Sequence, residues 1–201
     1  MKIKTLAKAK LPTPWAEFSI TAFEDTANGE EHLAISLGNL DNDPLLRIHS
    51  QCLTGDALFS LRCDCGSQLE MALKKIASEE AGLIIYMAQE GRGIGLGNKI
   101  KAYELQDEGM NTVEANESLG FEADERNYSI CGEILSSMNI ASVRLMTNNP
   151  SKIEGLIDSG IDVVDRVSIE VDASEHNNCL LYTSDAADEG LGVDLGGRRI
   201  I

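Results

Sequence analysis

Three of the five cysteines in this chain lie close together, as Cys52, Cys63 and Cys65 in a Cys-x10-Cys-x-Cys pattern. Thiolates are soft ligands, and three cysteines at this spacing are typical of a zinc site. Structural zinc sites usually have four protein ligands, whereas catalytic sites keep one position for water. Three ligands therefore predict a catalytic zinc centre. The alternative is three reduced cysteines in the core, but Arg62 and Asp64 make this segment polar.

His49, three positions before Cys52, has several interpretations. It is a candidate fourth zinc ligand, a candidate orienting group and a candidate base. It could also be an ordinary hydrogen-bonded histidine. Its neighbours Arg47 and Ser50 offer hydrogen-bond donors suited to an anion or a polar ligand. We therefore favour contact with a substrate over zinc ligation.

Charge and composition restrict the classes of partner. The formal net charge of -16 argues against a nonspecific nucleic-acid binder, which would carry a basic surface. An anionic substrate would need a local basic pocket. Residues 1–10 carry dispersed lysines and no apolar core segment, which argues against a signal peptide, and no apolar run suits a membrane span. Clustered cysteines without an export signal predict the reducing cytoplasm.

Apolar patterning predicts an α/β fold, with a mixed sheet flanked by helices and an N-terminal antiparallel hairpin region. The hairpin is expected from alternating residues on both sides of a turn at 25–29. The segment 112–126 is expected to be a polar connection. The expected strands are 17–22, 33–37, 45–49, 82–88, 143–146 and 162–171, and the expected helices follow residue 67 or span 99–106 and 128–138. Ligand loops should lie at the strand ends.

A glycine-rich loop, 89–97, separates the apolar run 82–88 from an expected helix. A strand, a glycine-rich loop and a helix N-terminus together make an anion-binding arrangement. The glycine spacing matches neither the dinucleotide fingerprint nor the Walker loop, and such a loop alone is equally consistent with a flexible turn. Arg92 favours anion binding, because its guanidinium can bind phosphate through two hydrogen bonds.

A second candidate anion site follows the strand 143–146. Asn149 is typical of a helix N-cap and Pro150 of the first helical position. Lys152 then falls in the first turn, where a cation is unfavourable unless an anion joins it. Taken alone, Asp124 and Arg126 indicate no more than a surface ion pair.

With these segments in place, the chain resembles the GTP cyclohydrolase II family over residues 1–175. Several separated motifs carry the resemblance, which makes it more specific than any one of them. They are Arg47-Ile-His-Ser-Gln-Cys-Leu-Thr-Gly-Asp56, Arg62-Cys-Asp-Cys-Gly66, Glu90-Gly-Arg-Gly-Ile-Gly95, Thr112-Val-Glu-Ala-Asn116, Asp124-Glu-Arg126 and Thr147-Asn-Asn-Pro-Ser-Lys152. The resemblance implies zinc-dependent conversion of GTP to a diaminopyrimidinone ribosyl phosphate, formate and pyrophosphate, the first step of riboflavin biosynthesis. It also implies a homodimer.

The resemblance implies a role for each matching residue. It places one Zn²⁺ per chain on Cys52, Cys63 and Cys65, as the spacing does, and Mg²⁺ with the GTP phosphates. The implied substrate contacts are Arg47, Ile48, His49, Ser50, Gln51, Gln68, Glu90, Gly91, Arg92, Thr112, Thr147 and Lys152. The implied catalytic residues are Asp124, Arg126 and Tyr103. The family commonly has glutamate at position 51, whereas the neutral amide of Gln51 accepts hydrogen bonds without a charge.

Two steps of this chemistry leave alternatives open. Opening the guanine imidazole ring requires water to attack C8, and zinc lowers the pKa of bound water from about 15.7 to about 7. Three thiolates weaken that effect, so a base or acceptor is expected among Tyr103, His49 and Asp124. Arg126 is assigned as a nucleophile in the family. Because guanidinium stays protonated, the alternative is that Arg126 stabilises transition-state charge while Asp124 holds its geometry.

Two other functions remain as alternatives. A zinc- and GTP-binding protein without turnover would keep the same motifs, although the intact Asp124, Arg126 and Tyr103 argue against it. A nucleobase deaminase would need a His/Cys-x-Glu and Pro-Cys-x-x-Cys arrangement, which this chain does not have. Residues 176–201 do not match the family's lysine-containing end and have no helical or strand period. We treat them as a divergent tail, a candidate for foreign sequence, outside the fold prediction.

Overall fold

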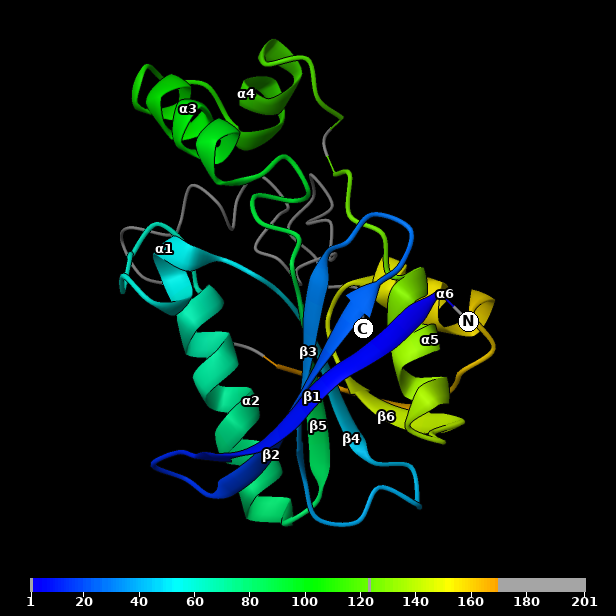
Figure 1. Cartoon of the computed structure of the whole chain (residues 1–201). Coiled ribbons are helices and arrows are strands. Elements are labelled where there is room, and N and C mark those ends of the chain that lie inside the picture. Colours follow the sequence, from blue (N-terminus) through cyan, green and yellow to red (C-terminus); the bar gives the residue numbers. More distant parts are fainter. Residues whose placement is uncertain (1, 123, 170–201) are drawn as a thin grey trace, which may run out of the picture.

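The computed structural model describes residues 2–122 and 124–169. These residues form a mixed seven-stranded sheet in the order β1-β2-β3-β5-β4-β6-β7, flanked by helices as predicted (Figure 1). The strands are β1 (Ile3–Pro12), β2 (Glu17–Asp25), β3 (Glu31–Leu37), β4 (Leu45–Ser50), β5 (Gly82–Met87), β6 (Ser142–Met146) and β7 (Asp162–Val167). The helices are α1 (Leu53–Asp56), α2 (Cys65–Glu79), α3 (Leu96–Asp107), α4 (Thr112–Ser118), α5 (Ser129–Ser137) and α6 (Pro150–Asp158).

The N-terminal half of the sheet is antiparallel. Strands β2 and β3 pair from Ser19 opposite Ser36 to Glu24 opposite Glu31, which confirms the predicted hairpin. Strand β1, which was not predicted, pairs antiparallel with β2 at the edge of the sheet. Its lysines masked the strand pattern, because this edge strand is exposed along most of its length. Charged side chains on an edge strand discourage pairing with another chain.

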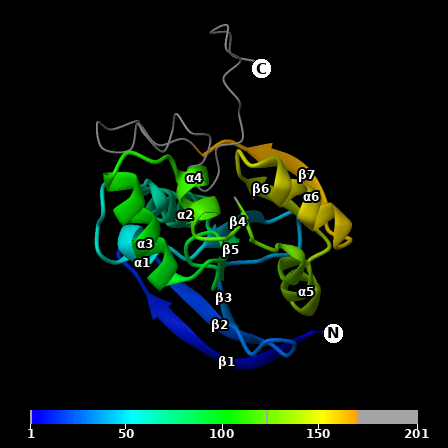
Figure 2. The ribbon, with the colours of Figure 1, turned by 90° about the horizontal axis from the view of Figure 1, so that it is seen from above.

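The second half of the sheet is parallel and positions the candidate site. Strand β4 pairs in parallel with both β5 and β6, and β6 pairs in parallel with β7. Helix α2 covers one face of the sheet, and α5 and α6 cover the other (Figure 2). Helices α1, α3 and α4 lie beyond the strand ends from which the connections to α1 and α3 leave (Figure 1). The loops after β4, β5 and β6 therefore meet at the carboxyl ends of these strands, as expected for ligand loops in an α/β sheet.

Three local predictions need correction. Residues 112–118 form helix α4 instead of a polar connection, because Asn111 and Glu114 form a reciprocal capping box. Helix α2 begins at Cys65, earlier than predicted, because Gly66 packs on the backbone of α1. A Cβ on Gly66 would lie 2.4 Å from the carbonyl oxygen of Gly55. The last strand ends at Val167, and the predicted residues 170 and 171 lie outside the described part of the chain, as does the tail 176–201.

The core has one layer on each face of the sheet. Ile48, Ile85 and Leu145 point toward α5 and α6, and Phe18 and Ile84 belong to the layer beneath α2. These central strands alternate between two apolar faces, which explains the continuous apolar run in β5. Among the described residues, no helix is long and apolar enough to cross a membrane.

Substituting Phe18 with alanine should destabilise the fold strongly. The ring is 1% exposed, and deleting a buried phenylalanine costs about 3–5 kcal/mol. Phe59→Ala is the matched control, because Phe59 is 84% exposed and should change the free energy of unfolding by less than about 0.5 kcal/mol. Urea denaturation of both variants measures the difference. Equal effects would contradict the assigned core.

Candidate active site

The three clustered cysteines meet at the junction of β4, α1 and α2. Their sulfur atoms lie within 4.8 Å of one another, and the Sγ atoms of Cys52 and Cys63 are 3.5 Å apart. Three sulfurs bound tetrahedrally to one zinc ion would lie about 3.8 Å apart. Gly55 makes room for them, because a Cβ there would be 2.8 Å from Cys63 Sγ and 3.2 Å from Cys52 Sγ. The donor set and its surroundings therefore fit a zinc ion.

The electrostatics of the cluster favour a thiolate. Hydrogen bonds with Cys63 and Cys65, and further the contact with Lys99, lower the pKa of Cys52 far below its usual range. In the same cluster the pKa of Cys63 is raised to about 11, chiefly by its hydrogen bond with Cys52. Cys52 is therefore the sulfur of the three that ionises most readily.

His49 is held by Asp56 rather than by the sulfurs. Its Nε2 lies 3.0 Å from Asp56 Oδ1, and its ring stacks on Tyr86 with centroids 5.4 Å apart. Asp56 also accepts hydrogen bonds from the Tyr86 hydroxyl and the Cys52 backbone N–H. Within the described residues, the group able to hold a metal consists of the three cysteines without His49. The arrangement supports the orienting interpretation over zinc ligation.

Helix α3 contributes two side chains next to the cysteine cluster. The Lys99 ammonium donates to Cys52 Sγ at 3.0 Å and to Glu90 Oε1 at 2.7 Å. One turn later, the Tyr103 hydroxyl lies 3.3 Å from Thr54 Oγ1, which is itself 3.6 Å from Cys52 Sγ. Burial alone would lower the pKa of Lys99, but Glu90 and Cys52 outweigh it and raise that pKa. Tyr103 is thereby connected to the cluster through one intervening hydroxyl.

The glycine-rich loop packs against the segment that carries Asp124 and Arg126. The Glu125 backbone N–H donates to the Arg92 carbonyl oxygen at 3.1 Å. Gly93 has φ of +93°, and a Cβ there would lie 3.1 Å from Glu125 Cβ, so both conformation and space favour glycine. The carboxylate of Asp124 accepts hydrogen bonds from two nitrogens of Arg126, from Nε at 2.8 Å and from a terminal nitrogen at 2.5 Å. The loop and the pair predicted as catalytic therefore form one unit.

Buried cations gather beside this unit. Arg47, on β4, donates to Gln68 Oε1 at 2.5 Å and to the Met146 carbonyl oxygen at 3.1 Å. Lys152, on α6, donates to the Ile48 carbonyl oxygen at 3.0 Å. Arg126 and Lys152 each lie 5.8 Å from the ring centroid of Tyr128. Burial lowers the pKa of Arg47 to about 10, a cost expected of a charge retained for an anionic ligand.

The remaining predicted contacts have distinct places. Ile48 and Ser50 lie on β4, and Gln51 follows it with its backbone N–H donating to the Met87 carbonyl oxygen at 2.8 Å. Thr147 follows β6 and accepts from the Asn149 N–H at 3.0 Å, and Asn149 caps α6 as predicted. Gly91 adjoins Glu90 in the glycine-rich loop. Thr112 is the first residue of α4, which lies with α3 above the sheet (Figure 1).

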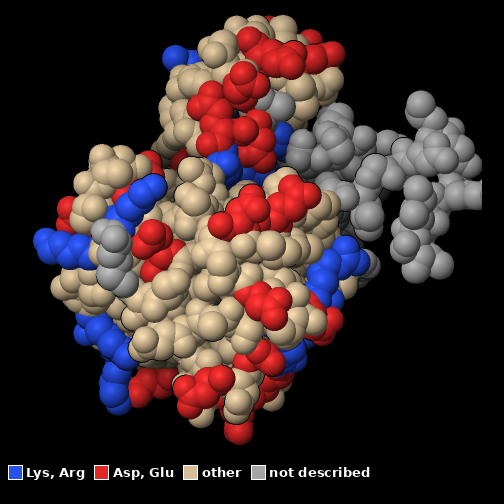
Figure 3. Space-filling view, turned by 90° about the vertical axis from the view of Figure 1, so that its right-hand side faces the viewer, with Lys and Arg blue, Asp and Glu red and all other residues tan. Residues whose placement is uncertain are grey.

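The distribution of charge agrees with the need for a local basic site. Acidic side chains are spread over the face shown in Figure 3, on its upper and its lower part. Arg47, within β4, and Lys152, in the first turn of α6, are by contrast fully buried. A concentrated positive charge inside an acidic molecule selects for an anion that can enter the site.

Replacing Lys152 with methionine should stabilise the fold. Burial lowers the pKa of Lys152 well below its usual range, and Arg47 and Arg126 lower it further. The Lys152 ammonium binds its proton more tightly in the unfolded chain than in the folded one. The loss of folding free energy caused by the charged lysine is therefore largest below its folded pKa and falls as the pH rises to about 10.4, the usual pKa of lysine. We expect a gain of about 1–4 kcal/mol at neutral pH, which shrinks toward pH of about 10.

Urea denaturation at several pH values tests this expectation. Lys74→Met is the control, because Lys74 is exposed on α2 and paired with Glu70, and it should change stability little. A loss of stability in Lys152→Met would show that the buried ammonium supports the fold.

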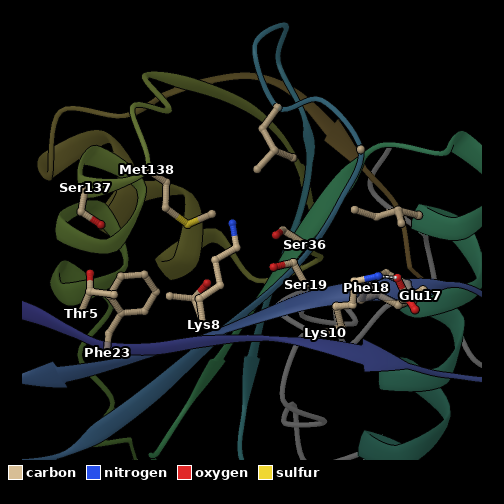
Figure 4. A pocket seen from close by; sticks show the side chains of 14 residues that line it. Thr5, Lys8, Lys10, Glu17, Phe18, Ser19, Phe23, Ser36, Ser137 and Met138 are labelled. Atoms are coloured by element: carbon tan, nitrogen blue, oxygen red, sulfur yellow. Dashed lines mark hydrogen bonds and ion pairs between the residues drawn. The ribbon is translucent and has the colours of Figure 1, made fainter.

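A hollow in the surface lies away from these residues. It has a volume of about 620 Å³ and is lined mainly by β1, β2 and the end of α5 (Figure 4). Lys8, Ser19 and Ser36 line it together with Phe23 and Met138. None of its lining residues belongs to the predicted site, which lies where the loops after β4, β5 and β6 meet.

Sequence reasoning missed Asp56 and Lys99 as members of the site. Asp56 lies four residues after Cys52, inside the cysteine motif, where its carboxylate accepts a hydrogen bond from the Cys52 N–H. Lys99 lies near the start of α3, where a cation is unfavourable without an anion. That argument singled out Lys152 and applied equally to Lys99.

Comparisons with known proteins identify relatives of this chain. The family model for GTP cyclohydrolase II matches residues 4–168. A GTP cyclohydrolase-2 of Shewanella baltica (strain OS155) is 57% identical over 185 residues, covering 91% of this chain and 91% of that protein. A GTP cyclohydrolase-2 of Buchnera aphidicola is 56% identical over 185 residues, covering 91% and 94% respectively. The solved structure of RibBX, a two-domain 3,4-dihydroxy-2-butanone 4-phosphate synthase from A. baumannii, gives a TM-score of 0.48 at 15% identity, over 85% of this chain and 41% of that chain.

Proposed function

The chain belongs to the GTP cyclohydrolase II family, and from this premise we propose that it hydrolyses GTP to a diaminopyrimidinone ribosyl phosphate, formate and pyrophosphate. This reaction opens riboflavin biosynthesis. The observation that carries the proposal is the group of three cysteine sulfurs with buried cations next to it, since Cys65 lies close enough to Arg47 and Lys152 to offset part of the lowering that burial causes in the pKa of both. A metal centre and an anion site adjoin each other, which the two hydrolytic steps require.

The proposed metal ligands are Cys52, Cys63 and Cys65, which would hold one Zn²⁺. A zinc ion there supplies Lewis acidity for attack of water on C8 of guanine. Tyr103 is best placed to assist, because its hydroxyl reaches the cluster through Thr54. Asp56 fixes the orientation of the His49 ring. We assign His49 to orienting the guanine base of GTP or to accepting a proton from the nucleoside. Gln68 stands next to Asp64, donating to its Oδ2 at 2.5 Å.

The proposed phosphate site combines the glycine-rich loop with the buried cations. Arg92, Arg47 and Lys152 bring positive charge to the ends of parallel strands, and Mg²⁺ would accompany the phosphates. Substrate contacts of Glu90, Gly91, Thr112 and Thr147 remain part of the proposal, as do those of Ile48, Ser50 and Gln51. The charge that accumulates on leaving pyrophosphate requires cations arranged before the reaction begins.

The geometry of Arg126 favours charge stabilisation over nucleophilic attack. Its side chain is 2% exposed and bound through two nitrogens by Asp124. Burial alone would raise the pKa of Asp124, but Arg126 outweighs it and lowers that pKa. The ionised carboxylate keeps the guanidinium protonated, and a protonated guanidinium has no lone pair to offer. Asp124 therefore aims Arg126 at the developing charge on the α-phosphoryl group.

The proposal includes two further expectations. Free thiolates at a zinc site persist in a reducing compartment, which supports the proposed cytoplasmic location. The family resemblance supports a homodimer, which light scattering of the purified protein would detect. A zinc- and GTP-binding protein without turnover is the second candidate, favoured only by the divergent tail.

Turnover of GTP by the purified full-length chain tests the proposal. The protein is stripped with a chelator, assayed with Mg²⁺, and assayed again after Zn²⁺ is returned. Formate should appear only after zinc is returned. A copy ending at Asn178 should release the same products, which would show that the tail is dispensable. GTP binding without either product in the zinc-loaded chain would support the inactive binder instead.

A further inference from the structure

Lys99 contacts a sulfur of the cysteine cluster directly, yet no role implied by the family resemblance involves it. Its side chain is 10% exposed, and its Nζ donates to Cys52 Sγ at 3.0 Å. A buried lysine is costly unless it is paired. The contact therefore needs an explanation beyond packing.

Three hydrogen bonds and the peptide bond between Cys52 and Leu53 hold Lys99 in a closed ring. Glu90 Oε1 accepts from the Lys99 ammonium at 2.7 Å, and Glu90 Oε2 accepts from the Leu53 backbone N–H at 2.7 Å. Leu53 is bonded to Cys52, which receives the ammonium and so closes the ring. Gly91 completes the enclosure, because a Cβ there would lie 3.0 Å from Lys99 Cβ. The ammonium is thus fixed toward the sulfur.

The charge of a three-thiolate site gives this contact a purpose. Three thiolates leave a divalent ion with one net negative charge and donate electron density that weakens its Lewis acidity. A charge-assisted hydrogen bond to one sulfur withdraws part of that density, as groups around other metal sites do for their ligands. We propose that Lys99 is a positioning residue whose ammonium, held by Glu90, hydrogen-bonds the Cys52 thiolate and raises the Lewis acidity of the zinc ion. This inference rests on the proposed zinc site.

The same contact anchors helix α3 to the metal site. Lys99 and Tyr103 are four residues apart, and side chains at that spacing share one face of a helix. The Lys99 ammonium also lies 5.7 Å from the ring centroid of Tyr103. Losing the anchor should therefore loosen the Tyr103 hydroxyl as well as change the charge on Cys52.

The test uses the full-length protein loaded with Co²⁺, whose absorption reports charge transfer from sulfur to the metal. In Lys99→Met the sulfur loses its hydrogen bond, so this band should move to longer wavelength than in the parent. Zinc-loaded Lys99→Met should release formate about 10–100-fold more slowly. Lys99→Arg keeps a cationic donor and should restore the parent band and most of the rate.

Lys101→Met is the matched control, because Lys101 lies on the same helix but is exposed. It should match the parent in both measurements. A parent-like band in cobalt-loaded Lys99→Met would overturn the inference while leaving the zinc site intact. If the parent itself shows no sulfur-to-cobalt band, the proposed zinc site fails and the inference falls with it.

Discussion

Replacing Cys65 with alanine should remove bound zinc and slow formate release by more than about 1000-fold. Cys65 begins α2 and supplies one of the three sulfurs of the candidate site. Two thiolates hold zinc less tightly than three, and without the ion the attacking water returns to a pKa of about 15.7. Zinc content per chain and formate release should therefore fall together.

Cys131→Ala is the matched control for this variant. Cys131 is also buried, but it packs among apolar side chains of the core, and burial raises the pKa of its thiol to about 12. The control should retain one zinc per chain and parent-like formate release. If Cys65→Ala kept both zinc and activity, the metal centre would have to lie elsewhere.

Replacing Arg126 with alanine should slow pyrophosphate release by about 1000-fold, the loss expected when a charge-stabilising arginine is removed from phosphoryl transfer. Arg126→Lys keeps the charge but lacks the planar fork that Asp124 binds, so an intermediate rate is expected. Pyrophosphate is followed directly. Arg144→Ala is the control, because Arg144 also pairs with a carboxylate, Glu79, but is partly exposed.

The same series separates the two roles assigned to Arg126. A charge-stabilising arginine forms no bond to phosphorus, so no protein-bound nucleotide should be recovered after an acid-free quench. Recovery of a covalent nucleotide adduct on Arg126 in the parent would establish it as the nucleophile and contradict the role favoured by its geometry.

The sequence predicted those features that depend on local pattern. Cys52, Cys63 and Cys65 were recognisable as a group because ligands of one ion must converge whatever the fold. Asn149 and Pro150 predicted the start of α6 because capping depends on adjacent backbone groups. The buried strands followed from their apolar runs, and the structure confirms the mixed sheet and its N-terminal hairpin.

Features that depend on distant partners were not predicted. Lysines hide the alternation of apolar residues in strand β1. They are tolerated there because the strand lies at the exposed edge of the sheet. Lys99 became part of the site only when β5, the glycine-rich loop and α3 brought it to Cys52, which is 47 residues away. Asp124 and Arg126 had the spacing of a surface ion pair, and only the fold buries the Arg126 side chain beside Tyr128.

The most direct test of the central claim counts formate and pyrophosphate in the same sample of zinc-loaded protein turning over GTP. One site that performs both hydrolytic steps predicts that the two products appear in equal amounts. Pyrophosphate without formate would show that the cysteine cluster does not act on the guanine ring. Bound GTP with neither product would contradict the assignment of this chain as a cyclohydrolase.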